Sequence, residues 1–238
     1  MTQEIPQGLR RFSGVILKRD RSAEGDVSLY LFLKGTGTAW VSVPGAARGS
    51  VRFGGSIEPL VWGNFNLYKG TRRFYLKSVD VKEDFWELRT SPWRLRTLLE
   101  WDMLLCEHIV PGIPCDEILA LFYWCGILLK QGVHPGAGEW RFLWKWLENW
   151  GLAPSLEICV DCGSRFGEGA FWTERGLQCR SCGRTGAFLP ERDLLLLRLA
   201  AETPFSRMPE LFTGSGEDLD SPWKDAVRRL KRLFEYAG

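Results

Sequence analysis

The chain has 238 residues and a mass of 27.2 kDa, which is enough for two or three small domains. Hydrophobic residues make up 45% and charged residues 25%, a balance that excludes a fibrous or disordered chain. The longest apolar run covers residues 118–129, which is shorter than the roughly 20 residues that a membrane-spanning helix needs. The first residues, MTQEIPQGLRRF, contain no apolar stretch typical of a secretion signal. We therefore expect a soluble protein of the cytoplasm.

The net charge of +2 is unevenly spread along the chain. Residues 1–80 hold 12 Lys and Arg against 6 Asp and Glu, residues 81–158 hold 7 against 11, and residues 159–238 hold 12 against 12. The positive charge therefore lies in the first third. A locally basic domain favours a polyanionic partner, although solvated Lys and Arg are common on any protein surface.

The first eighty residues alternate short apolar runs with Gly-rich or charged breaks. Five of these runs are predicted strands: residues 12–17, 27–33, 39–43, 57–62 and 74–81. Short strands at this spacing favour a small barrel or sandwich over βαβ units. Five strands in about 75 residues fit an OB-fold, a small barrel whose face binds oligonucleotides, while other small barrels fit the pattern too. We expect this domain to cover residues 1–82.

A helical period begins at Ser91-Pro92, a pair typical of a helix start. We expect a helical domain over residues 83–156 and carboxy-terminal helices over residues 189–238 that pack with it. The first predicted helix starts at Pro92 and the last at Pro222. Between them, helices are predicted over residues 116–130, about 139–150 and 190–201. Trp140, Trp144, Trp146 and Trp150 lie in one of them and are expected to pack in the core. A hydrophobic groove for a partner peptide is the alternative.

Two C-x-x-C pairs give the strongest chemical signal, in a predicted module of residues 157–188. Cys159, Cys162, Cys179 and Cys182 have the spacing of a structural zinc site, because two such turns supply the four sulfurs of a tetrahedral ion. A glycine follows each pair, which allows a positive φ there. Mononuclear iron would use similar ligands, and free thiols or disulfides are the plain alternative. Four protein ligands leave no open position for catalysis.

Basic residues cluster three times in the predicted barrel, with aromatic residues nearby. A positive groove with aromatic platforms is typical of single-strand binders, because phosphates need charge and bases stack on rings. The predicted DNA-binding residues are Arg10, Arg11, Lys18, Arg19, Arg21, Trp40, Arg48, Arg52, Phe53, Lys69, Arg72 and Arg73.

Motifs of common enzymes are absent from the sequence. It contains no G-x-x-x-x-G-K-[ST] phosphate loop and no G-x-G-x-x-G after a strand. The two histidines, His108 and His134, lie near no nucleophile motif. We therefore expect no catalytic residues and no enzyme.

Several segments in this order resemble the bacterial recombination mediator family RecO over nearly the full chain. The segments are Gly14–Leu17, Glu24–Asp26, Gly45–Arg48, Arg52–Leu60 and Leu67–Gly70, followed by the four cysteines after Trp150–Pro154. The resemblance implies an α+β multidomain protein: an amino-terminal five-stranded OB-fold barrel, then an α-helical domain with an inserted four-cysteine zinc module.

The resemblance also implies an activity in recombinational repair of DNA damage. It predicts binding to single- and double-stranded DNA, annealing of complementary strands and help in loading recombinase onto coated single strands. Implied partners are DNA, RecR, the acidic and apolar-ended tail of single-strand-binding protein and, functionally, RecA, at the nucleoid. Two alternatives stay open: a generic zinc-containing nucleic-acid-binding module, and a protein-interaction scaffold with no nucleic-acid role.

Overall fold

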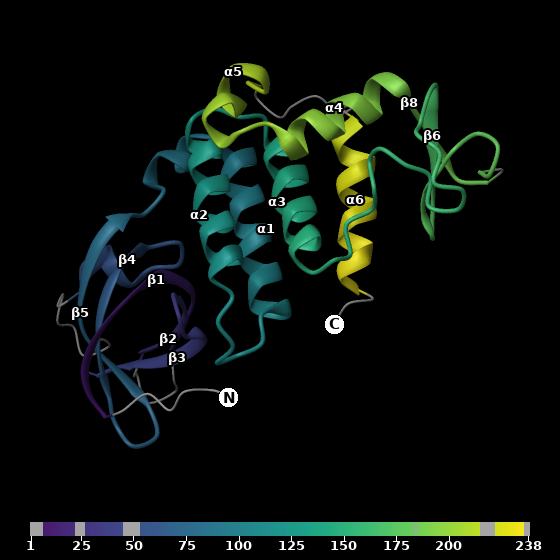
Figure 1. The fold of residues 1–238 in the computed structure, drawn as a ribbon. Coiled ribbons are helices and arrows are strands. Elements are labelled where there is room, and N and C mark those ends of the chain that lie inside the picture. The colour runs from purple at the N-terminus through teal and green to yellow at the C-terminus, as the bar shows by residue number, and fades with distance from the viewer. Residues whose placement is uncertain (1–6, 22–26, 45–52, 184, 215–221, 236–238) are drawn as a thin grey trace. The chain divides into compact units, whose positions relative to one another are not determined.

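The computed structural model describes residues 7–21, 27–44, 53–183, 185–214 and 222–235. The chain divides into two compact units, residues 1–123 and 124–238, and each unit is described by itself (Figure 1). The divide falls inside a helix rather than at a predicted domain boundary. The first unit holds β1 (Gly8–Arg21), β2 (Val27–Leu33), β3 (Gly37–Val43), β4 (Trp62–Lys69), β5 (Phe74–Glu83), α1 (Pro92–His108) and the start of α2 (Asp116–Lys130).

The five strands of the first unit form a closed barrel in the order β1-β2-β3-β5-β4. All neighbouring pairs are antiparallel except β3 and β5, which run parallel, and β4 pairs with β1 to close the sheet. Inward-pointing residues such as Leu29, Leu31, Val41 and Phe65 are fully buried and form the core. The expected five-stranded OB-fold is confirmed.

The fourth strand lies later in the sequence than predicted. The apolar run at residues 57–62 predicts a strand, but Gly54–Ile57 is a 3-10 helix. Ile57 of this helix and Val61 of the turn that follows it pack into the barrel core. The strand is Trp62–Lys69, whose residues alternate between buried and part-exposed positions. Its phenylalanine and leucine point inward and its asparagines outward, which is the pattern of a half-buried strand. The prediction favoured the more apolar of two adjacent segments.

The helices of the first unit begin close to where the sequence predicts. Ser91 stands at the N-cap of α1, and its carbonyl oxygen accepts a hydrogen bond from Leu95 N–H at 3.0 Å. His108 ends the same helix. The bounds of α2, Asp116–Lys130, match the prediction.

The second unit is built on α3 (Pro135–Asn149), which starts four residues before its predicted start. His134 caps it, because its Nδ1 accepts a hydrogen bond from Gly136 N–H at 3.0 Å. A Cβ on Gly136 would lie 2.6 Å from Cβ of Trp223, so the glycine lets α6 pack closely against α3. The other elements are β6 (Gly169–Thr173), β7 (Gly176–Gln178), β8 (Ala187–Pro190), α4 (Glu191–Glu202), α5 (Met208–Leu211) and α6 (Pro222–Glu235).

Tryptophans form much of the core of the second unit. Trp140 and Trp146 are fully buried, which confirms core packing for them, and Trp140 Nε1 donates to the carbonyl oxygen of Leu197 at 2.8 Å. Trp146 packs edge-on against Phe234 of α6. None of the helices in the described part of the chain combines the length and apolarity that crossing a membrane requires.

Candidate functional site

A groove of about 500 Å³ lies along β3 and the β4–β5 hairpin of the barrel. Four of the twelve predicted DNA-binding residues line it: Trp40, Lys69, Arg72 and Arg73. They come from segments about thirty residues apart, and the register places β3 beside β5, with Val41 opposite Phe74. The barrel thus brings one aromatic side chain and three cations to one groove.

The cations of the groove are available to a ligand. Arg72 and Arg73 are exposed in the hairpin, and neither has an ion pair with any residue that the structure describes. Lys69 Nζ lies 4.7 Å from the centre of the Phe74 ring, a cation–π contact that leaves its charge uncompensated by a carboxylate. Three basic side chains without acidic partners therefore face one groove.

Trp40 supplies the flat apolar surface of the groove. Its side chain is 47% exposed, although it lies in a strand whose neighbouring inward residues are fully buried. One side of the indole packs against Tyr30, with ring centres 4.9 Å apart and an angle of 37° between the planes. A half-exposed ring held from one side is a suitable stacking surface for a base.

Two serines that the prediction missed complete the groove. Ser28 and Ser42 line it and are paired across β2 and β3. Each lies between buried apolar residues, so the two-residue period of a strand was the signal that could have placed them on the outer face.

The other predicted DNA-binding residues that the structure describes lie outside this groove. Arg11 pairs with Asp80 at 3.1 Å, Lys18 with Asp20 at 3.4 Å, and Arg19 with Glu58. Phe53 packs against the barrel core. Arg10 and Arg21 are exposed on β1, and Arg48 and Arg52 lie outside the described residues.

The pairing of Arg11 has a clear electrostatic cause. Hydrogen bonds from Lys82 and Asn64 hold the pKa of Asp80 below its usual value, and the charges of Lys82 and Arg11 add to the effect. Asp80 therefore stays ionised between two cations. These side chains come from β1, β4 and β5, where polar residues also bond to each other, as Asn66 does to Ser78 at 2.8 Å.

The four cysteines of the second unit come together as predicted. The Sγ atoms of Cys159, Cys162, Cys179 and Cys182 all lie within 4.8 Å of one another. The Sγ atoms of Cys162 and Cys179 are 3.7 Å apart. A tetrahedral ion with bonds of about 2.3 Å to sulfur would hold two sulfur atoms about 3.8 Å apart. The residues fit a four-sulfur metal ion.

Each cysteine pair is shaped by a tight backbone turn. Gly163 N–H donates to the carbonyl oxygen of Cys159 at 3.0 Å, and Gly183 N–H donates to that of Cys179 at 2.7 Å. Gly163 has φ +71°, as expected, but Gly183 does not have a positive φ. A Cβ on Gly183 would lie 2.8 Å from Cβ of Phe171, so close packing is the reason for that glycine.

Hydrogen bonds favour the thiolate form at the first pair. Burial raises the pKa of Cys159, but backbone N–H groups of Cys162, Cys179 and Asp161 outweigh it and lower that pKa to about 6. The pKa of Cys162 is lowered by Ser164, whose Oγ lies 3.0 Å from its sulfur. Thiolate is the form that binds a metal.

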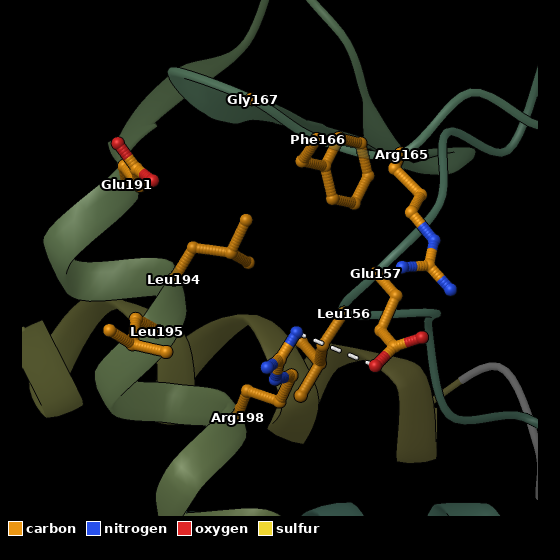
Figure 2. A pocket seen from close by; sticks show the side chains of 9 residues that line it. All are labelled: Leu156, Glu157, Arg165, Phe166, Gly167, Glu191, Leu194, Leu195 and Arg198. Atoms are coloured by element: carbon orange, nitrogen blue, oxygen red, sulfur yellow. Dashed lines mark ion pairs between the residues drawn. The ribbon is translucent and has the colours of Figure 1, made fainter.

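A smaller hollow of about 270 Å³ lies between residues 156–167 and α4 (Figure 2). Leu156 and Leu194 form an apolar wall. Arg198 pairs with Glu157 at 3.4 Å on one side, and Arg165 stands at the rim.

Comparisons with known proteins match both parts of the chain. Residues 126–215 match the family described as Recombination protein O C terminal. A DNA repair protein RecO of Rubrobacter xylanophilus is 28% identical over 237 residues, which cover 96% of this chain and 92% of that protein. This chain is similar to RecO proteins over most of its length. RecO proteins of Alkaliphilus metalliredigens and Acetivibrio thermocellus are each 25% identical, over 81% and 71% of this chain and 79% and 69% of their own length. The four cysteines fall inside the matched carboxy-terminal region, and the groove lies outside it.

Proposed function

We propose that this chain acts as a RecO-type mediator of recombinational DNA repair and binds DNA in the barrel groove. The observation that carries the proposal is the meeting of Lys69, Arg72, Arg73 and the exposed Trp40 in one groove. The groove uses β2, β3 and the β4–β5 hairpin, which are the parts of an OB-fold that bind oligonucleotides. The similarity to RecO proteins supports the same role.

The proposed mechanism is electrostatic and uses no bond chemistry. The three cations neutralise phosphates of a bound strand, and Trp40 stacks on a base, which keeps the strand extended. Neutralised phosphates repel a complementary strand less, so the second strand anneals more readily. In this account the protein binds single- and double-stranded DNA and promotes recombinase loading on coated strands.

We propose that the cysteine cluster holds one structural zinc ion. Cys159, Cys162, Cys179 and Cys182 would supply its four ligands, and the ion would tie together the two turns that carry them. The second turn joins β7 to β8 of a small three-stranded sheet, so the ion would stabilise this small region rather than take part in a reaction.

We further propose RecR, RecA and the tail of single-strand-binding protein as functional partners. The hollow beside α4 combines a leucine wall with Arg165 at its rim, while Arg198 is held by Glu157 (Figure 2). We propose that Arg165 binds the acidic part of the tail peptide and that the leucines bind its apolar end. A labelled tail peptide should bind the protein and lose affinity in Arg165→Glu. The matched control is Arg207→Glu, another exposed arginine that lies outside this hollow. Equal binding to both variants would remove the hollow as the docking site.

The test of the proposed function is annealing of complementary strands coated with single-strand-binding protein. Wild type should accelerate it, and Arg72→Ala with Arg73→Ala should abolish most of the acceleration. The control is Arg11→Ala with Lys82→Ala, which removes the same charge from the same barrel but outside the groove. DNA binding without annealing would favour a generic zinc-containing nucleic-acid-binding module, and no DNA binding would favour an interaction scaffold.

A further inference from the structure

Trp40 rests on a tyrosine that is itself held by a buried hydrogen bond. Tyr30 lies opposite Trp40 on β2, is 7% exposed and covers one side of the indole. Its hydroxyl donates a hydrogen bond to Oγ1 of Thr38 at 2.8 Å. Because Thr38 is 1% exposed, water does not compete for this bond. The ring beneath Trp40 is therefore fixed at its far end.

Thr38 is fixed in turn by the loop between α1 and α2, in the same unit. Its carbonyl oxygen accepts a hydrogen bond from Gly112 N–H at 3.0 Å, and its backbone forms a parallel bridge with Pro111. A second bond joins the same hairpin to the start of α2, where Gly35 N–H donates to Oδ1 of Asp116 at 2.7 Å. A continuous set of contacts thus leads from the loop through Thr38 and Tyr30 to Trp40.

We infer that Tyr30 and Thr38 are positioning residues of the DNA groove, and that they act on DNA only through Trp40. Neither hydroxyl is exposed to a ligand, since both residues are buried. A half-exposed tryptophan on a strand has several side-chain orientations, and a base gains most from stacking when the ring is already held in one of them. The inference rests on the proposed function of the groove.

The barrel interior alone does not explain this arrangement. The core is made of the inward residues of the five strands, whereas Tyr30 and Trp40 form a pair across β2 and β3 on the outer face. An outer-face tyrosine would ordinarily direct its hydroxyl to water. Here the hydroxyl turns to a buried threonine instead, which leaves the far side of the indole open to the groove.

The test is a double-mutant cycle between Tyr30→Phe and Trp40→Ala, measured as affinity for an oligothymidine strand. Tyr30→Phe keeps the ring and removes only the hydroxyl. We expect it to weaken binding about threefold to tenfold, the effect of one lost buried hydrogen bond. In the Trp40→Ala background the same change should have no further effect. Binding to an abasic strand of equal length should not change in Tyr30→Phe, because that strand has no bases to stack.

A second variant controls for an effect of Tyr30→Phe on folding. Tyr30→Phe with Thr38→Val removes both polar partners, so no buried group is left without a hydrogen bond, and stability should stay near that of wild type. Its affinity for oligothymidine should match that of Tyr30→Phe. If Trp40→Ala leaves that affinity unchanged, both the stacking role in the proposed function and this inference fail. If Trp40→Ala weakens binding but Tyr30→Phe has no effect, or has the same effect with and without Trp40, the inference alone is overturned.

Discussion

Gly37 of β3 and Ile113 of the loop between α1 and α2 are in direct backbone contact. A Cβ on Gly37 would lie 2.2 Å from the carbonyl oxygen of Ile113, closer than any real Cβ contact. Gly37 also has φ +81°. The helical segment of the first unit therefore packs against the strand that carries Trp40 with no side chain between them.

Substitution of this glycine tests the contact. Gly37→Ala should lower the free energy of unfolding by more than about 2 kcal/mol, because it adds a clash to the strain of a positive φ. The matched control is Gly35→Ala in the same hairpin, which has φ +70° but meets no atom within 4 Å. It should cost only about 1 kcal/mol. If urea unfolding gives the same loss of unfolding free energy for both variants, Gly37 and Ile113 are not in close contact.

Asp102 makes the stability depend on pH. It lies on α1 and is 6% exposed, and burial raises its pKa from the ordinary 3.8 to about 8. Between these values the folded state keeps a proton that the unfolded state releases, so stability falls as pH rises through this window. Asp102→Asn cannot ionise and should be more stable than wild type at pH 8, by on the order of a few kcal/mol.

Thermal unfolding of both proteins from pH 4 to pH 9 measures this difference. The two melting temperatures should be close near pH 4, and the gap should widen as pH rises and level off above about pH 8. A gap that does not change with pH would mean that Asp102 does not titrate as described.

Removal of the proposed zinc ion should affect the second unit alone. Trp172 of β6 packs edge-on against Trp140 of α3, with ring centres 6.1 Å apart, so loss of order around the cysteines should change near-ultraviolet circular dichroism. Chelation or Cys179→Ser should lower the zinc content from about one ion per chain to none and lower the melting temperature. Cys115→Ser, which changes a cysteine outside the cluster, should do neither. Oligonucleotide affinity should survive, since the groove lies in the barrel.

Arg141 is a buried cation that holds two helices together. It is 4% exposed, and its Nη1 donates to the carbonyl oxygens of Ala200 at 2.9 Å and Ala201 at 3.1 Å, at the end of α4. Arg141→Met leaves these carbonyl groups without their donor and should cost about 2–4 kcal/mol of unfolding free energy. Lys145→Met, on the same helix but in a part-exposed ion pair with Glu148, should cost under about 1 kcal/mol. Similar losses would contradict the buried role of Arg141.

Local patterns were enough to predict the barrel, most helices and the cysteine cluster. The strand β2 and the helix α2 have the predicted bounds, because each has a regular apolar pattern with clear breaks on both sides. The start of α3 was missed because glycines at its first turn indicate a loop, whereas here Gly136 makes room for Trp223. The short strands β6 to β8 were missed because they have too few residues for a period.

The candidate site was only partly predictable, because charge partners lie far away in sequence. Arg19 pairs with Glu58 and Arg11 with Asp80, 39 and 69 residues away, and no local pattern indicates such pairs. Arg72 and Arg73 look the same as these arginines in sequence. Only the folded barrel distinguishes cations held by carboxylates from cations that face the groove.

The most direct measurement of the central claim is the salt dependence of single-strand binding. Each phosphate contact contributes about −0.7 to the slope of log affinity against log salt concentration. Arg72→Ala with Arg73→Ala should therefore weaken binding and make the slope shallower by about 1.4. Arg11→Ala with Lys82→Ala should leave the slope near that of wild type. The account is contradicted if the groove variant keeps the wild-type slope or if the control variant loses as much.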